Sequence, residues 1–192
     1  SRGMIAISAE YRIKSKHGTT PFESIEDAKS AIRFVRKNSK SYSINSQRIA
    51  AAGGSAGGHL AASTANVKGF DNSNENLQVS SKPNALVLYN PVLDTGPDTW
   101  GYNSFLRRMD GKMTINPIEG SPFHGISKDS PPTIILTGTN DKIVSVEMIS
   151  RYKEKMESFN VRCDVIFYDG AEHSFFNKGE DFIDTLLKSD LF

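Results

Sequence analysis

The segment AAAGGSAGGHLAA, residues 50–62, is the one around which the other predicted elements are arranged. Small apolar residues before Ser55 predict a buried strand, and the alanine-rich run after it predicts a helix. Between them, residues 53–57 fit the pattern Gly-x-Ser-x-Gly, which is typical of the strand–turn–helix connection called a nucleophile elbow. Such a turn strains the serine backbone and exposes its hydroxyl. We expect a Cβ atom at Gly53 or at Gly57 to collide with the neighbouring strand and helix.

This turn predicts the chemistry of Ser55 and of the residue that follows it. A helix that begins here points its unpaired N–H groups and its positive dipole end at the serine hydroxyl. We therefore predict that Ser55 is a nucleophile and that the Ala56 amide is an oxyanion donor. The alternative is a glycine-rich phosphate loop, but the segment lacks the spacing and lysine of a P-loop and does not fit Gly-x-Gly-x-x-Gly. Five residues do not decide between these, so partners of the serine must be found elsewhere.

The overall composition excludes several classes of protein. A length of 192 residues suits a single domain, residues 1–192, with a sizeable core. A net charge of +1 argues against a nucleic-acid partner, and no apolar run is long enough to span a bilayer. The single cysteine, Cys163, lies in a predicted strand and is expected to be a small core residue. The chain starts Ser1-Arg2-Gly3 rather than with a methionine, so the sequence leaves the cellular compartment open.

Strand and helix signals alternate along the chain, which predicts an α/β fold with a mostly parallel sheet of about five strands and helices on both faces. The predicted strands cover residues 4–9, 48–53, 85–89, 133–136 and 161–168. The predicted helices cover residues 22–38, the segment after Ser55, and residues 145–158 and 180–188. The irregular segment of residues 92–130 is expected to form a small cap that contains a short helix at residues 104–109.

Two residues complete a candidate catalytic triad with Ser55. Asp141 and His173 each follow the carboxyl end of a predicted strand, and in parallel sheets these ends meet at one edge. A serine hydroxyl needs an imidazole to accept its proton, and the imidazole needs a carboxylate on its other nitrogen. The chain order nucleophile, acid, histidine also agrees with one known arrangement of such triads.

Other histidines and acids compete for these roles, namely His17, His59, His124, Asp94, Asp169 and Glu147. His59 follows Ser55 by one helical turn and is expected to pack into the scaffold. His124 lies in the cap, where it either contacts substrate or is exposed. Asp94 follows the strand at residues 85–89 and is the alternative acid. The remaining three are expected to be solvated or to shape turns.

Together these segments resemble the α/β-hydrolase esterases, in particular the hormone-sensitive-lipase-like group and the bifunctional feruloyl and acetyl-xylan esterases. Many hormone-sensitive-lipase-like members have Asp before the serine, whereas Gly54 here favours the acetyl and feruloyl esterases. The resemblance implies hydrolysis of a carboxylic ester, such as a short acyl, acetyl or feruloyl ester of a carbohydrate, with no metal or organic cofactor. The matching segments are residues 5–12, 53–58, 90–94, 121–122, 138–141 and 170–173.

The resemblance also implies elements that this sequence lacks. Family members begin with three further strands, and a His-Gly-Gly stretch after the third completes the oxyanion hole. Residues 4–9 correspond to the fourth strand of family members, in which the third strand lies between the fourth strand and the strand that leads to the elbow. Without the third strand, residues 4–9 are expected either to move beside residues 50–53 or to pair with another molecule. The chain is thus expected to be N-terminally truncated. We expect a homo-oligomer in which a second copy covers the face left open.

The substrate pocket and the overall activity have alternatives. Gly54 and the cap aromatics Trp100, Tyr102, Phe105 and Phe123 are candidates for binding the acyl or alcohol group, although cap aromatics also form small cores of their own. A peptidase of the prolyl-oligopeptidase type shares the fold and the order of the triad. A catalytically silent hydrolase domain is the third alternative, because the second oxyanion donor is missing.

Overall fold

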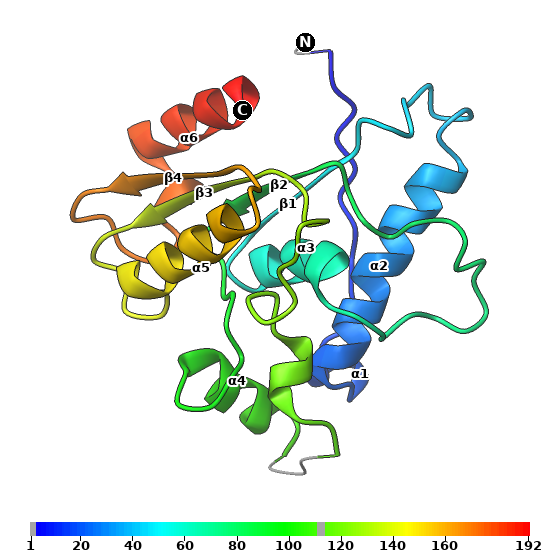
Figure 1. Ribbon diagram of the computed structural model, residues 1–192, viewed down its shortest axis with the longest axis horizontal. Helices are drawn as coiled ribbons and strands as arrows, with labels where there is room; N and C mark the ends of the chain where they lie inside the picture. Colours follow the sequence, from blue (N-terminus) through cyan, green and yellow to red (C-terminus); the bar gives the residue numbers. More distant parts are fainter. Residues whose placement is uncertain (1–2, 111–113) are drawn as a thin grey trace.

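A parallel sheet organises the chain in the computed structural model, which describes residues 3–110 and 114–192 (Figure 1). In the described residues the sheet has four strands in the order β1-β2-β3-β4, and every neighbouring pair is parallel. This confirms the predicted α/β fold. The strands are β1 (Ala50–Gly54), β2 (Ala85–Tyr89), β3 (Thr133–Gly138) and β4 (Cys163–Tyr168).

The central strands are apolar because both of their faces are covered. All six residues of β3 are buried, and Leu86 and Leu88 of β2 are fully buried. Strands buried on both faces are expected to be continuous apolar runs rather than alternating ones. Registers such as Leu88 beside Ile135 hold the carboxyl ends of the strands at one edge of the sheet.

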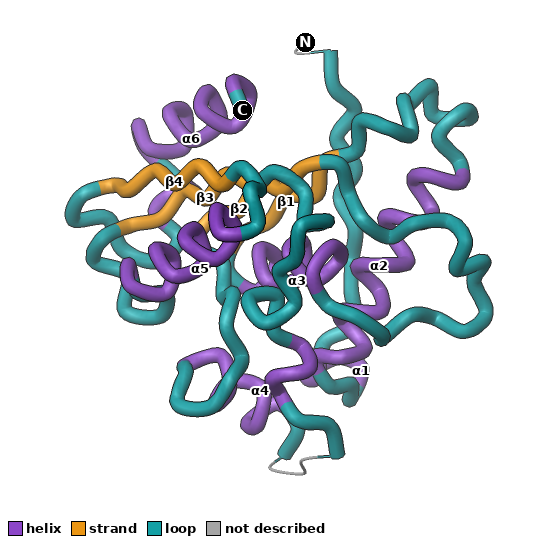
Figure 2. The backbone as a smooth tube through the Cα atoms, in the orientation of Figure 1, coloured by secondary structure: helices purple, strands orange, loops and turns teal. Residues whose placement is uncertain are grey.

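Helices cover the two faces of the sheet unequally (Figures 1 and 2). On one face lie α3 (Ala56–Asn66) and α5 (Val146–Ser158), with α2 (Pro21–Lys37) against α3. They enclose the main core with residues such as Ala62, Leu86 and Tyr152. The opposite face carries α6 (Gly179–Leu191), which lies over the β4 side. The four longer predicted helices are thus confirmed, with ends that differ by at most three residues from the predicted ones.

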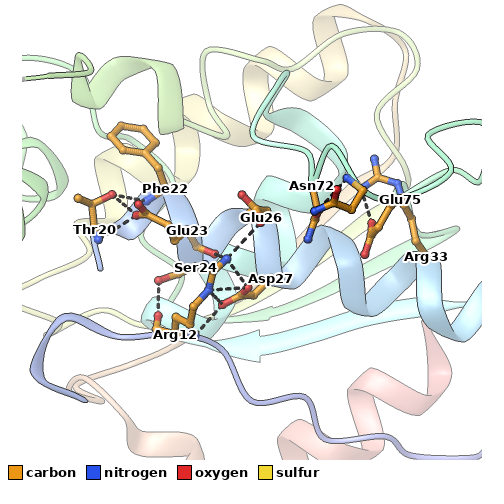
Figure 3. Close-up of polar contacts among 11 residues, drawn as sticks. Arg12, Thr20, Phe22, Glu23, Ser24, Glu26, Asp27, Arg33, Asn72 and Glu75 are labelled. Atoms are coloured by element: carbon orange, nitrogen blue, oxygen red, sulfur yellow. Dashed lines mark hydrogen bonds and ion pairs between the residues drawn. The ribbon is translucent and has the colours of Figure 1, made fainter. Parts of the chain in front are cut away.

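Polar side chains fasten the N-terminal segment to α2 (Figure 3). The Thr20 side chain and Glu23 form a capping box at the start of this helix. Arg12 donates from Nε to Asp27 Oδ1 at 2.9 Å, and its terminal nitrogen reaches Asp27 at 2.7 Å and Glu26 at 3.2 Å. These contacts hold residues 10–13 against α2 although no strand pairing anchors them.

The strand expected at residues 4–9 is not formed. These residues are extended but unpaired, and Met4, Ile5 and Ile7 are exposed. A groove of about 610 Å³ separates them from β1, and α2 and α3 form its floor. A single extended run has no partner for its backbone hydrogen bonds, so the apolar pattern alone does not make a strand. Among the described residues, β1 therefore pairs only with β2.

Residues 92–130 contain two short helices and extend below α3 (Figure 1). They are α4 (Trp100–Arg108) and the 3-10 helix η1 (Pro117–Gly120), and residues 111–113 of this insert lie outside the described residues. Helix α4 starts earlier than predicted because the Thr99 hydroxyl accepts from the Tyr102 amide and caps it. Phe105 of α4 packs edge-on against Phe22 of α2, with ring centroids 5.5 Å apart. This contact between aromatic rings attaches the insert to α2.

Two further short helices lie outside the elements predicted from the sequence. They are α1 (Lys14–His17) and the 3-10 helix η2 (Phe175–Asn177). None of the helices in residues 3–110 and 114–192 combines the length and the apolar character needed to cross a membrane.

Candidate active site

Ser55 occupies a strained turn between β1 and α3. Its backbone has φ 53° and ψ −116°, a conformation that side-chain-bearing residues rarely adopt. The Ser55 amide donates to the Tyr89 carbonyl at 2.8 Å, and the Ser55 carbonyl accepts from the His59 amide at 3.0 Å. A Cβ atom at Gly53 would overlap the Gly57 carbonyl group, so the helix can approach the strand only with glycine at this position. This turn presents the hydroxyl at the carboxyl edge of the sheet.

Among the other glycines of the turn, Gly57 does not have the close contact that was expected of it. A Cβ atom at Gly57 would meet nothing within 4 Å, because this position faces the groove between β1 and residues 5–11. The collision expected there does not occur. At Gly58, by contrast, a Cβ atom would lie 3.0 Å from Pro91 Cβ. At Gly54 it would overlap the Phe176 ring, so Gly54 makes room for the loop that carries His173, and it is not among the residues that line the cavity beside Ser55.

Asp141 lies in the loop after β3, and its side chain is fully buried. Its Oδ1 atom accepts from the Ile143 amide at 2.8 Å and from the Val144 amide at 3.0 Å. Its Oδ2 atom accepts from Asn90 Nδ2 at 2.6 Å. A buried carboxylate is tolerated only when it is paired and hydrogen-bonded, and these donors meet that requirement.

His173 connects the carboxylate to the serine. Its Nδ1 atom lies 2.7 Å from Asp141 Oδ2, and its Nε2 atom lies 2.7 Å from Ser55 Oγ. The loops after β3 and β4 can approach each other because Gly138 leaves space for the Ala171 carbonyl. The Ala171 carbonyl also accepts from the Asn140 amide at 3.0 Å. The structure thus brings the three residues singled out in the sequence into one hydrogen-bonded chain.

A cavity of about 630 Å³ opens beside Ser55 and is mainly apolar. Ser55 and Ala56 line it from the turn and the start of α3, and Trp100 and Phe105 line it from α4. Phe123 does not line this cavity. Instead its ring packs beneath Lys155 Nζ, at 4.5 Å, and Arg151. Further residues lining the cavity are Tyr11, Thr20, His59, Leu60, Val92 and Arg108.

The competing side chains lie in other environments. His59 is buried, its Nδ1 atom lies 2.8 Å from the Val92 carbonyl, and burial lowers its pKa to about 4. His17 Nδ1 accepts from the Ile13 amide on the exposed helix α1. Asp94 accepts from the Gly96 amide at 2.7 Å and lies 3.5 Å from His124 Nδ1. The contacts of Asp94 lie within the insert, and none of them is made with the imidazole of His173.

Two residues that contact this site were not predicted from the sequence. Asn90 bonds Asp141, and Phe176 packs on Gly54 and on Tyr89, whose ring centroid lies 5.0 Å away. The Asn-Pro pair directly after a predicted strand was a usable signal for Asn90. Among the residues that the structure describes, no group of three or more His, Cys, Asp or Glu side chains is arranged to hold a metal ion.

Comparisons with known families match both halves of the chain. The model of the family described as BD-FAE matches residues 1–99, and that of the dienelactone hydrolase family matches residues 119–188.

Solved structures extend this similarity to the whole chain. The apo form of Thermogutta terrifontis esterase 2 has a TM-score of 0.92 and 38% identity, over 100% of this chain and 71% of that one. The propionate-bound form of that esterase has a TM-score of 0.89, 38% identity and the same coverage.

Two curated relatives are longer proteins. Endo-1,4-beta-xylanase B of Butyrivibrio fibrisolvens is 31% identical over 64% of this chain and 20% of its own length. Esterase LipC of Mycobacterium tuberculosis is 26% identical over 91% of this chain and 46% of its own length. The chain thus spans between a fifth and a half of the length of these relatives.

Proposed function

The chain belongs to the BD-FAE family of α/β-hydrolase esterases, and from this premise we propose that it hydrolyses carboxylic esters through an acyl intermediate on Ser55. The observation that carries the proposal is the hydrogen-bonded chain Ser55–His173–Asp141, with 2.7 Å at both contacts of the imidazole. A base within this distance of a serine hydroxyl is the arrangement that activates a serine for acyl transfer.

Each group has one role in the proposed reaction. His173 Nε2 takes the proton of Ser55 as Oγ forms a bond to the ester carbonyl carbon, and Asp141 stabilises the imidazolium. The proton then passes from His173 to the departing alcohol oxygen as the C–O bond breaks. Water attacks the acyl group in the same way, with His173 again accepting the proton, and releases the acid and the free serine.

The Ala56 amide is the proposed oxyanion donor. It is the first amide of α3, so it has no partner within the helix and lies at the positive end of the helix dipole. Residues 1–192 contain no His-Gly-Gly stretch of the kind the family resemblance implies. Since loss of one oxyanion donor typically lowers kcat by about 10²–10³-fold, we expect slow turnover from these residues alone.

The proposed substrates are esters of short acyl groups, with acetyl or feruloyl esters of carbohydrates as the natural class. The apolar cavity beside Ser55 supports an apolar acyl group. A propionate-bound form of the Thermogutta esterase and the xylanase relative support a short chain and a carbohydrate, respectively.

The test compares wild type with Ser55→Ala on p-nitrophenyl acetate and butyrate, methyl ferulate and acetylated xylan. We expect wild type to release acid and the variant to lose nearly all of that turnover. A fluorophosphonate that labels wild type but not Ser55→Ala would show a working nucleophile even where deacylation is slow. Equal ester turnover in the two proteins, with no labelling of Ser55, would contradict the proposal and favour a silent domain. Cleavage of a proline-containing peptide in place of esters would favour the peptidase alternative.

We further propose that a second copy of this chain covers its open face. Met4, Ile5 and Ile7 are exposed, and so are Phe182 and Leu187 of α6. The outer edge of β1 has no strand beside it among the described residues. Unpaired strand edges and exposed apolar side chains are features of association sites, and a copy of the same chain carries both.

A further inference from the structure

Asn90 combines two features that are unfavourable for stability. It directly follows β2 and is fully buried, and its φ of 41° lies in the left-handed region. This region costs energy for any residue with a side chain, although asparagine tolerates it better than most. Its Oδ1 atom is also buried and has no hydrogen-bond partner among the described residues. A glycine would relieve the strain and remove the unpaired oxygen, so the presence of asparagine calls for a compensating contact.

The compensating contact is made by Nδ2, the nitrogen of the Asn90 side-chain amide. Asn90 Nδ2 donates to Asp141 Oδ2 at 2.6 Å and to Thr137 Oγ1 at 3.3 Å. Oδ2 is the oxygen that faces His173 Nδ1, whereas the two backbone amides that hold the carboxylate bond Oδ1. Among the described contacts of Asp141, Asn90 is thus the one that supports the oxygen facing the imidazole.

We propose that Asn90 is a positioning residue that holds Asp141 Oδ2 on His173. The inference rests on the proposed function, in which Asp141 stabilises the imidazolium of His173. A neutral amide suits this position because it donates two protons without adding a charge, whereas a carboxylate would repel Asp141 and an apolar side chain would leave Oδ2 with one donor fewer. Asn90 does not line the cavity beside Ser55, so its effect falls on reaction of the serine rather than on substrate binding.

The first experiment replaces the amide without straining the backbone. Asn90→Gly removes the donor and accepts the left-handed conformation freely. We expect kcat for p-nitrophenyl acetate, and the rate of Ser55 labelling by a fluorophosphonate, to fall about 10- to 100-fold, as for loss of a hydrogen bond to a charged group, with KM unchanged. The matched control is Asn160→Gly, an exposed asparagine at φ 57°, which is expected to label at the wild-type rate. Wild-type labelling by Asn90→Gly would overturn the proposal.

The second variant distinguishes a donated proton from a filled space. The carboxyl group introduced by Asn90→Asp can donate to Asp141 only while it is protonated, and burial beside another carboxylate favours that form. The ratio of variant to wild-type labelling rates is therefore expected to fall as the pH rises. A ratio that is low but independent of pH would indicate a purely structural role and overturn the proposal.

A measurement that needs no turnover separates this inference from the proposed function. The His173 Nδ1 proton, bonded to Asp141, is expected to give a slowly exchanging low-field NMR resonance in wild type. Asn90→Gly is expected to broaden or shift it upfield, while circular dichroism shows the fold unchanged. An unchanged resonance overturns the positioning role whether or not the protein hydrolyses esters. Failure of Ser55→Ala to differ from wild type overturns the proposed function instead.

Discussion

Asp141 can only accept hydrogen bonds, and this determines which nitrogen of His173 carries the proton. A carboxylate has no proton to donate, so Nδ1 must donate across the 2.7 Å contact to Oδ2. Nε2 is then the unprotonated nitrogen and faces the Ser55 hydroxyl at 2.7 Å. The same carboxylate has backbone amides on Oδ1, so it stays in place while the imidazole gains and loses its proton.

The carboxylate is the residue whose replacement should be most informative. In Asp141→Asn the amide can turn its N–H group to Nδ1, which forces the proton of His173 onto Nε2 and removes the base. We expect kcat to fall about 10⁴-fold while the fold is retained, with a smaller unfolding free energy because the new amide nitrogen faces the Asn90 Nδ2 donor. Steady-state kinetics on an activated ester and urea denaturation measure the two effects.

Asp94→Asn is the matched control for this change. Asp94 is buried like Asp141, but it bonds the Gly96 amide and lies beside His124. We expect kcat to stay close to the wild-type value, because Asp94 contacts Gly96, Ser121 and His124 and none of the three triad residues. A large loss in Asp94→Asn together with an active Asp141→Asn would reassign the acid.

Burial of His59 makes the stability of the fold depend on pH. Burial lowers the pKa of His59 to about 4, from an ordinary value of 6.5. As the pH falls below 6.5 the unfolded chain binds a proton at His59 that the folded protein does not bind, so stability is lost on acidification. The loss amounts to about 3 kcal/mol once the pH reaches the folded pKa. Urea denaturation at about pH 7 and about pH 4 should show a smaller loss for His59→Gln, and equal losses in both proteins would contradict this.

At the scale of elements, the contact between β1 and α3 determines how Ser55 is presented. The turn works because the strand and the helix approach at Gly53, where a side chain would overlap the backbone of Gly57. A side chain at Gly57 would not overlap the strand, since Gly57 faces the open groove. Two glycines that look equivalent in the pattern therefore differ in what they contact.

Alanine substitutions at these two glycines should have opposite effects. Gly53→Ala forces the strand and helix apart and is expected to cost about 1–3 kcal/mol of unfolding free energy and most of the Ser55 labelling. Gly57→Ala adds a methyl group in open space on a helix, where alanine is favoured over glycine by about 0.5–1 kcal/mol. Urea denaturation of the two variants measures the difference, and equal destabilisation would show that the groove is filled in solution.

At the scale of the molecule, the two faces of the sheet are not equally protected (Figure 2). The face under α3 and α5 holds the main core, whereas the other carries α6, whose apolar side chains Phe182, Ile183 and Leu187 remain exposed. Away from α6, the segment of residues 4–9 also exposes the apolar side chains Met4, Ile5 and Ile7. Removing such surface from water is favourable, so contact between copies is the arrangement expected in solution.

Light scattering after size exclusion measures this association. We expect a dimer or larger species at micromolar concentration, and a shift towards monomer in the double variant Ile5→Glu, Ile7→Glu. Leu77→Glu is the matched control, because Leu77 is exposed to a similar degree but lies in the loop between α3 and β2. A well-folded, monodisperse wild-type monomer would contradict the proposed oligomer.

Much of this arrangement follows from local sequence patterns. Apolar runs and helix signals in the sequence located the four paired strands and the four long helices. Ser55, Asp141 and His173 were each assigned to the end of a strand, and the structure brings them within hydrogen-bond distance. Parallel strands share one carboxyl edge, so residues far apart in the chain become neighbours there.

Other features depend on contacts that no local pattern records. The run at residues 4–9 has the composition of a strand, yet it stays unpaired because a strand needs a neighbour for its backbone hydrogen bonds. The fit of Phe176 against Gly54, the bond from Asn90 to Asp141 and the open space at Gly57 likewise join segments far apart in the chain. Periodicity reports which side of an element is buried. What lies against that side is set by the packing of the whole chain.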